Sequence, residues 1–194
     1  PGLVRGSVIG YMLAVFATNS PRFGATGLNI IAAISAIPTV ALAAVILQWT
    51  RDVSNDVDVR SYVMKLVIVT VVSTASMTLN AYRGLTELKP FALDLMKSYA
   101  ANKMTVLFYL RAPNSLPYIF ISLKVSVPAG VIAALVSEYF AEKITGVGRR
   151  IRECILQAQY STAWAYIVTA CIIGIVLFAI LMASEKLIMR KRSS

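Results

Sequence analysis

Residues 98–117 read SYAANKMTVLFYLRAPNSLP and lie between two long apolar runs of the chain. Asn102 can cap a short helix, because its side-chain oxygen can accept hydrogen bonds from backbone N–H groups just downstream. Pro113 and Pro117 disfavour helix at the residues before them, so the chain is expected to turn before a membrane span begins at Tyr118. The stretch therefore predicts helical structure outside the membrane, closed by a turn.

The connection that contains this stretch begins upstream, near Arg83. Pro90 suits the first turn of a helix, where its missing N–H would have been unpaired anyway. Apolar residues then recur at helical spacing while charged residues fall elsewhere on the helix; the apolar positions are Leu93, Met96, Ala100, Met104 and Leu107. Residues 83–117 are therefore predicted to form an amphipathic helical hairpin, which either lies on the lipid surface or docks onto a partner.

The composition on either side of the hairpin is that of an integral membrane protein. Of the 194 residues, 58% are hydrophobic and 14% are charged, and the mean hydropathy is +0.72. A soluble domain has about 25% charged residues. Apolar runs of about 20 residues must be helices, because only a helix satisfies its own backbone groups in lipid. The fold class is predicted to be all-α, a polytopic transmembrane bundle of about five spans at residues 2–18, 28–49, 62–82, 118–137 and 164–183.

The first run begins almost at Pro1, with no basic segment of the signal-peptide kind before it. We therefore expect the run to be retained as a span, and we expect the sequence to lack one further N-terminal span.

The distribution of Lys and Arg predicts the orientation of the spans. If the hairpin is cytoplasmic, its side holds ten of these residues: Arg22, Arg83, Lys89, Lys97, Lys103, Arg111, Lys186, Arg190, Lys191 and Arg192. The opposite side holds six, namely Arg51, Arg60, Lys143, Arg149, Arg150 and Arg152. The count favours a cytoplasmic hairpin and a cytoplasmic C-terminus, although the arginine cluster at 149–152 is the kind usually found inside.

The net charge of +10 would allow nucleic-acid binding in a soluble protein. In so apolar a chain, basic residues more often set the topology and meet anionic lipid headgroups, so membrane lipid is the expected partner and nucleic acid is not. Histidine is absent, and the two cysteines, Cys154 and Cys171, are expected to be unpaired thiols. The sequence predicts no metal site and no cofactor.

The third predicted span carries Thr70, Thr74 and Thr78 at intervals of four, with Asn80 nearby. This spacing places the three hydroxyls on one face of a helix. They either hydrogen-bond between packed helices or line a polar pathway, and the residues alone leave both interpretations open.

Within the hairpin, Asp94 is followed by Ala100 and then by a closing Pro113. This order resembles the cytoplasmic coupling loop of permease subunits of binding-protein-dependent ABC importers, where an acidic residue, two alanines, a glycine and a Leu-Pro pair take these places. The sequence departs from the family at Asp94, Leu95, Met96, Ala100 and Ala112.

Other parts of the chain resemble the same family in the right order. Residues 3–14 resemble its second span, 36–42 its proline-bearing third span, and 80–85 the entry to the coupling loop. Glu138 with Gly146-Val-Gly148 resembles the acidic residue and Gly-x-Gly of the loop before the last span. The likeness is greatest to the sulfonate, nitrate, taurine and pyrimidine-precursor branch, whose members have one more N-terminal span and hold this loop outside.

The resemblance implies a type I ABC importer permease in the cell membrane, and not an enzyme. It implies one transmembrane domain, residues 1–194, with a coupling loop at 83–117, an outer loop at 138–163 and a basic cytoplasmic tail at 184–194. The sequence has no G-x-x-x-x-G-K-[ST] phosphate loop, so a separate ABC ATPase subunit would hydrolyse ATP. An extracytoplasmic substrate-binding protein and a second permease copy, in a homodimer, are the other implied partners.

The resemblance also assigns site residues. The ATPase contact is expected at Asp94, Ser98, Ala100, Ala101, Asn102 and Lys103, and an outer gate at Glu138. In such a permease, the expected pathway lining is the polar face already identified by its spacing, which is Thr70, Thr74, Thr78 and Asn80. The rival interpretation is a small secondary carrier with a hairpin on the membrane surface. Ion-coupled carriers need an ionisable residue inside the membrane, and the middle of the predicted spans holds no Asp, Glu or His.

Overall fold

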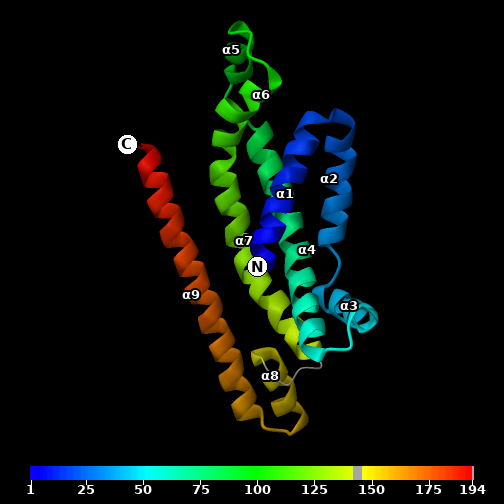
Figure 1. Ribbon diagram of the computed structural model, residues 1–194. Helices are drawn as coiled ribbons and strands as arrows, with labels where there is room; N and C mark the ends of the chain where they lie inside the picture. Colours follow the sequence, from blue (N-terminus) through cyan, green and yellow to red (C-terminus); the bar gives the residue numbers. More distant parts are fainter. Residues whose placement is uncertain (142–145, 194) are drawn as a thin grey trace.

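The computed structural model describes residues 1–141 and 146–193, and every regular element in these ranges is a helix (Figure 1). In chain order the elements are α1 (Gly2–Asn19), α2 (Pro21–Ser35), α3 (Thr39–Val53), α4 (Val57–Thr86), α5 (Ala92–Ser98), α6 (Lys103–Val106), the π-helix η1 (Leu107–Arg111), α7 (Ala112–Phe140), α8 (Val147–Leu156) and α9 (Tyr160–Ser193). The all-helical prediction is confirmed.

Three described helical stretches are long and apolar enough to cross a membrane: Val57–Thr86, Lys103–Phe140 and Tyr160–Arg190. A bent pair, Thr26–Ser35 with Thr39–Asp52, makes up to four. The prediction of about five spans is therefore higher than the three or four that helix length and hydropathy support in the described residues. The first predicted span corresponds to α1, which has only 18 residues and carries Arg5 near its start.

The bend falls within the second span expected at residues 28–49. Its two halves meet at 87°. Pro38, which has no N–H to donate to the carbonyl one turn back, stands at the N-cap of α3. The N–H groups of Ala36 and Ile37 instead donate to carbonyls three residues back, which tightens the end of α2.

The turn expected before Tyr118 is wrong, because α6, η1 and α7 form one unbroken stretch, Lys103–Phe140. Pro113 falls in the first turn of α7, just after η1, and Pro117 lies inside the helix. In η1 the Ala112 N–H donates to the Leu107 carbonyl, five residues back. The wider π-turn accommodates a proline at its end, so the helix continues where local sequence rules predict a stop. At the other arm, α5 begins at Ala92 and Pro90 precedes it.

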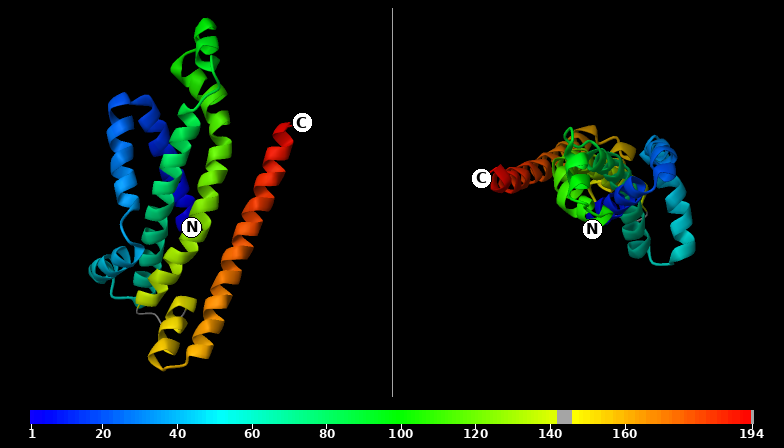
Figure 2. Two further views of the ribbon diagram at one scale, coloured as in Figure 1. Left: turned by 180° about the vertical axis from the view of Figure 1, so that it is seen from behind. Right: turned by 90° about the horizontal axis from the view of Figure 1, so that it is seen from above.

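Helices α1, α4 and α7 form the packed centre of the bundle (Figures 1 and 2). The buried residues of α1 are all small: Gly2, Gly6, Gly10, Ala14 and Ala17. A Cβ atom built on Gly6 or Gly10 would lie 2.6 Å from a backbone oxygen of α4. Small residues four apart allow this close approach of two membrane helices. The glycine seam, as we call this contact of α1 with α4, was not predicted from the sequence.

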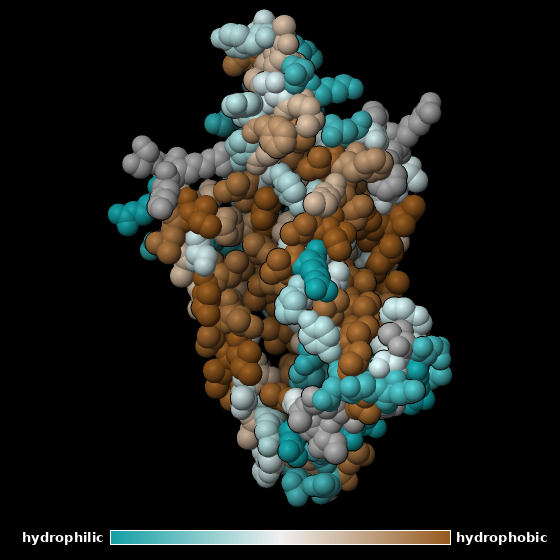
Figure 3. Space-filling model, in the orientation of Figure 1, coloured by the Kyte–Doolittle hydropathy of each residue, from teal (hydrophilic) through white to brown (hydrophobic). Residues whose placement is uncertain are grey.

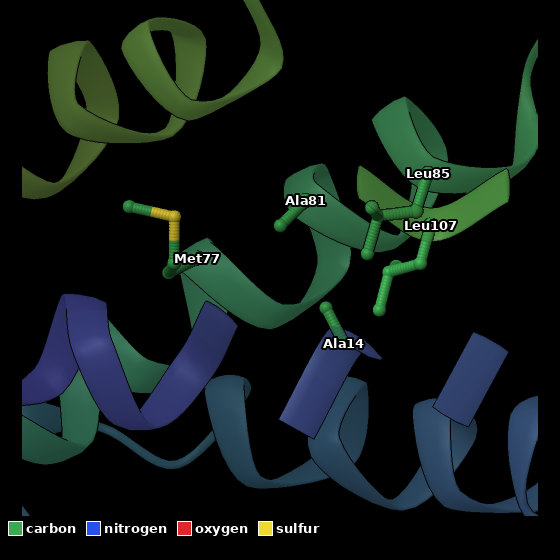
Figure 4. Packing of buried hydrophobic residues seen from close by; sticks show 5 residues of the cluster. All are labelled: Ala14, Met77, Ala81, Leu85 and Leu107. Carbon is green, nitrogen blue, oxygen red and sulfur yellow. The ribbon is translucent and has the colours of Figure 1, made fainter. Parts of the chain in front are cut away.

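A hydrophobic cluster joins these helices near the base of the hairpin (Figure 4). Leu107, in η1, packs with Ala14 of α1 and with three residues of α4, which are Met77, Ala81 and Leu85. All five side chains are at most 8% exposed. The start of the long α6–η1–α7 stretch is therefore anchored in the core.

Helix α9 stands apart from α7 toward its C-terminal end (Figures 1 and 2). Only 6% of its most apolar window is buried, against 33% for the corresponding windows of α4 and of Lys103–Phe140. Hydrophobic surface covers the middle of the molecule, with hydrophilic residues gathered at both ends (Figure 3). This belt is typical of a protein that lies across a lipid bilayer.

Candidate functional site

The hairpin of α5 and α6 projects from one end of the bundle (Figure 1). Its tip is a Schellman turn at the C-terminus of α5, in which the Ala101 N–H donates to the Met96 carbonyl at 3.1 Å and the Ala100 N–H donates to Lys97 at 2.9 Å. Ala100 has a φ of +51°. That left-handed conformation favours glycine, which is the residue that the resemblance assigns to this position.

The other expected contact residues lie around this turn. Asp94 and Lys97 are exposed and form an ion pair of 3.0 Å, and the Ser98 hydroxyl donates to Leu95. The Asn102 side chain accepts from the Thr105 N–H at 2.7 Å, so the predicted cap of the second helix is confirmed. Lys103 is exposed in the first turn of α6. The six residues therefore lie along the hairpin, from the first turn of α5 through the turn at Ala100 to the first turn of α6.

Large apolar side chains also lie exposed on and beside the hairpin, a feature that was not predicted from the sequence. Phe91, Tyr99 and Tyr109 are each more than three-quarters exposed, and Leu95, Met104 and Phe108 are more than half exposed. Exposed aromatic and apolar residues beyond the apolar belt mark a contact surface. The signal in the sequence is the aromatic pair at 108–109, which interrupts the amphipathic pattern.

Side chains of η1 and α7 bind the end of α4 at the base of the hairpin. The Asn114 amide donates to the Gly84 carbonyl at 2.8 Å and to the Glu87 carbonyl at 2.9 Å. The Tyr118 hydroxyl donates to the Glu87 carboxylate at 3.0 Å, and Arg111 donates to the Leu85 carbonyl at 3.4 Å. Residues 98–117 therefore supply both the tip of the hairpin and most of the contacts that close its base.

At the opposite end of the bundle, Glu138 joins three helices. Its carboxylate forms an ion pair of 2.5 Å with Lys65 of α4 and accepts the Gly148 N–H, in the first turn of α8, at 3.1 Å. Gly146 has a φ of +126°, and a Cβ there would lie 2.7 Å from the Glu138 carboxyl carbon. The Glu138 side chain is 17% exposed. The residue suggested as an outer gate is thus held by partners on α4 and α8.

Helix α8 lies in the part of the chain taken from the sequence as an outer loop, residues 138–163, of which 142–145 fall outside the described residues. Its arginines are occupied locally: Arg149 and Arg150 both pair with Glu153, and Arg152 lies over the Tyr139 ring, 5.8 Å from its centre. These contacts explain how the cluster can lie at the end away from the hairpin. The i, i+4 pair of Arg149 and Glu153 was a helix signal that the sequence analysis missed.

The threonine face of α4 is turned toward the glycine seam. Thr78 is buried, and the hydroxyls of Thr70, Thr74 and Thr78 donate to carbonyls one turn back in their own helix at 2.7–2.8 Å. Thr70 also reaches the Gly2 carbonyl of α1 at 3.3 Å, which is a contact between helices. The Asn80 amide donates to Ser76 within α4.

A largely apolar cavity of about 570 Å³ lies between the bundle and α9. Lys65 and Glu138 line one part of it, and residues of α1, α4, α7, α8 and α9 line the rest. Across the gap, Lys124 of α7 forms an ion pair of 2.7 Å with Glu185 of α9. Cys154 is buried in α8, Cys171 is exposed on α9, and both are free thiols.

Comparison with known proteins agrees with this geometry. The chain is 24% identical to the formylaminopyrimidine transport permease protein ThiX of Halalkalibacterium halodurans over 188 residues, which are 97% of this chain and 72% of that protein. It is 26% identical to a probable ABC transporter permease protein of Haemophilus influenzae over 138 residues, or 71% of this chain and 53% of that protein. Residues 6–194 match the family model of the binding-protein-dependent transport system inner membrane component. The chain therefore belongs to this family of ABC transporter permeases, with the type I importer fold.

Proposed function

We propose that this protein is the permease subunit of an ATP-driven importer and that its hairpin couples the membrane helices to a separate ABC ATPase. The observation that carries the proposal is the hairpin itself. It projects beyond the apolar belt (Figure 3) and exposes large apolar side chains around a compact, internally hydrogen-bonded tip. Such a rigid projection can seat in a groove of a partner and transmit its displacement.

The proposed contact residues are Asp94, Ser98, Ala100, Ala101, Asn102 and Lys103, which lie on α5, on the turn at Ala100 and at the start of α6. Asp94 and Lys103 would offer charges to the ATPase, and the exposed side chains of Phe91 and Tyr99 would offer apolar area. ATP-driven closure of the ATPase would displace the hairpin and bias the bundle between inward-facing and outward-facing states.

For the cargo, we propose a small polar solute of the pyrimidine-precursor kind, supported by the name of the ThiX relative. An extracytoplasmic binding protein would deliver it at the end where Glu138 and α8 lie, and Glu138 would act there as part of an outer gate. Thr70, Thr74 and Asn80, which are partly exposed, would contribute polar groups along the pathway, whereas the buried Thr78 would stabilise the contact of α4 with α1. A second copy of the chain, forming a homodimer within membrane lipid, would complete the pore.

In this assignment the hairpin end is cytoplasmic. The C-terminus lies toward the same end of the molecule (Figure 1), which supports a cytoplasmic tail. The coupling loop would extend over residues 83–117 and the outer region over residues 138–163 of the single transmembrane domain, residues 1–194.

The test is purification of the tagged protein from its native membranes in mild detergent, with identification of co-purifying chains by mass spectrometry. We expect a stoichiometric ATPase subunit that is lost when residues 94–103 are replaced. We expect Ala100→Trp to uncouple transport from ATP hydrolysis, because a bulky side chain enters the contact at a left-handed position, while the matched Ala100→Gly variant remains coupled. Purification with no ATP-hydrolysing partner would instead favour a carrier whose hairpin rests on lipid.

A further inference from the structure

We propose that Asn114 ties the two arms of the hairpin at its base, and that this tie makes α4 and α7 move together when the hairpin is displaced. The inference rests on the proposed coupling function and adds the route by which the displacement enters the bundle. In it Asn114 is a positioning residue, since it contacts neither the cargo nor the tip of the hairpin.

Both N–H donors of the Asn114 amide are used by the tie. A side-chain amide has two N–H donors, and here the nitrogen donates to the carbonyls of Gly84 and Glu87 at 2.8 and 2.9 Å. These carbonyls belong to the last turn of α4 and its C-cap, whereas Asn114 belongs to the first turn of α7. The Asn114 side chain therefore joins the arm that leads out of the hairpin to the end of α4, which leads into it.

The tie completes the C-terminus of α4. The last four carbonyls of a helix have no partner within the helix. In α4, the Arg83 carbonyl accepts from Glu87 N–H at 2.7 Å, and the Thr86 carbonyl accepts from Leu88 N–H at 3.0 Å. The two carbonyls between them, Gly84 and Leu85, accept from side chains of the other arm. The end of α4 is thus capped by the helix with which it must move.

The adjoining arm needs such a tie. Pro113 and Pro117 have no N–H, so the helical hydrogen-bond ladder loses two donors within one turn of Asn114. Next to them lies η1, and a π-turn inside a helix is a common site of bending. Without the tie, the arm could bend more easily at this point, and less of the displacement would reach α4.

The end of α4 and the start of α7 also pack closely beside Asn114, which leaves them little room to move relative to each other. A Cβ built on Gly84 would lie 2.8 Å from the Ser115 Cα and from the Tyr118 Cβ, and Leu107 is anchored in the core cluster beside Leu85. A displacement that reaches Asn114 therefore arrives at α4 and α7 in the same step.

The test uses the complete complex purified from native membranes. The readout is the stimulation of ATP hydrolysis by the binding protein. The binding protein would act at one end of the bundle and the ATPase at the other, so the stimulation reports coupling through the bundle without a transport assay. Asn114→Asp keeps the size of the side chain but replaces both donors with an ionised acceptor. We expect the ATPase to co-purify, unstimulated hydrolysis to persist, and the stimulation to fall about tenfold, the scale set by two lost hydrogen bonds. The matched control is Asn19→Asp, since the Asn19 amide is exposed and donates to Val15 in its own helix.

A cross-link separates lost coupling from lost folding. In a background with Cys154→Ser and Cys171→Ser, the pair Glu87→Cys and Asn114→Cys should be weakly stimulated when reduced. Joining the two thiols with a short bis-thiosulfonate reagent should restore the stimulation. Wild-type stimulation in Asn114→Asp or in the reduced pair, or its loss on cross-linking, would overturn the inference. An unaltered complex that contains no ATPase would overturn the proposed function instead.

Discussion

Lys65 and Glu138, which are 73 positions apart in the sequence, form an ion pair of 2.5 Å that joins α4 to the end of α7. The same carboxylate accepts the Gly148 N–H at the start of α8. A carboxylate near a helix N-terminus is stabilising because it meets unpaired N–H groups and the positive end of the helix dipole. Glu138 therefore holds the first turn of α8 at the end of α4 and α7.

We expect Glu138→Ala to destabilise the docking of α8 by roughly 2 kcal/mol, because it removes a charged hydrogen bond and leaves Lys65 without its partner. Lys65→Met should cost less, since the contact with Gly148 remains. The measurement is the temperature at which buried Cys154 becomes reactive to a thiol probe in a Cys171→Ser background. Equal effects of the two variants would show that Gly148 contributes nothing.

Gly148 offers a sharper test of the same contact. A Cβ there would lie 2.2 Å from the Leu135 carbonyl oxygen, whereas a Cβ on Gly130 would meet its nearest neighbour at 3.6 Å. Gly148→Ala should therefore expose Cys154 at a lower temperature, with a cost of about 2 kcal/mol or more from overpacking against backbone. Gly130→Ala is the control and should change the Cys154 reactivity little. The opposite order would contradict the docking of α8 seen here.

The tip of the hairpin should become more stable in Ala100→Gly. A non-glycine residue in the left-handed conformation costs about 1 kcal/mol, which glycine avoids. Trypsin cleavage at Lys97 and Lys103 reports local opening of the tip, and it should slow about fivefold in the variant.

Ala101→Gly is the matched control for this change. The described non-glycine residues with positive φ are Phe91, Ala100 and Ala158, so Ala101 has an ordinary backbone conformation. Glycine at this position should speed the cleavage, because it adds only flexibility. Slower cleavage in both variants would mean that φ at position 100 is not the cause.

Local chemistry explains which parts of this molecule could be predicted from its sequence. The apolar runs and the Asn102 cap depend on neighbouring residues, and the structure has both. The likeness of Glu138 and Gly146-Val-Gly148 to the family was also a sequence observation, and these residues meet in space.

The features that were missed depend on partners distant in the sequence. The helix continues through Pro113 because η1 widens the turn before it. The glycines of α1 are needed because the backbone of α4 lies too close for a side chain, and this neighbour is distant in the sequence. Asn114 could be predicted as a turn residue, but its bonds to Gly84 and Glu87 span 30 and 27 positions. No local rule predicts such a contact.

The glycine seam should be intolerant of any added side chain. In Gly6→Ala the new Cβ would lie 2.6 Å from the Thr70 oxygen, so α1 must move away from α4. We expect a loss of roughly 1–3 kcal/mol, measured as a lower midpoint of thermal aggregation in detergent. Val4→Leu enlarges a side chain that is 65% exposed on the same helix and should leave the midpoint unchanged. A normal midpoint in Gly6→Ala would mean that α1 does not pack on α4 through its glycines.

The ion pair of Lys124 and Glu185 should hold α9 against α7. Their side chains are 31% and 21% exposed, and α9 has few other buried contacts. Glu185→Leu should leave the Lys124 charge without its partner beside apolar helices. It should therefore lower the midpoint of thermal aggregation more than any single substitution of an uncharged residue on α9. Adding Lys124→Met to that variant should recover most of the loss, because replacing a whole ion pair with apolar residues is often nearly neutral. If the double variant is as unstable as the sum of the single ones, the two charges act independently and α9 is held by apolar packing alone.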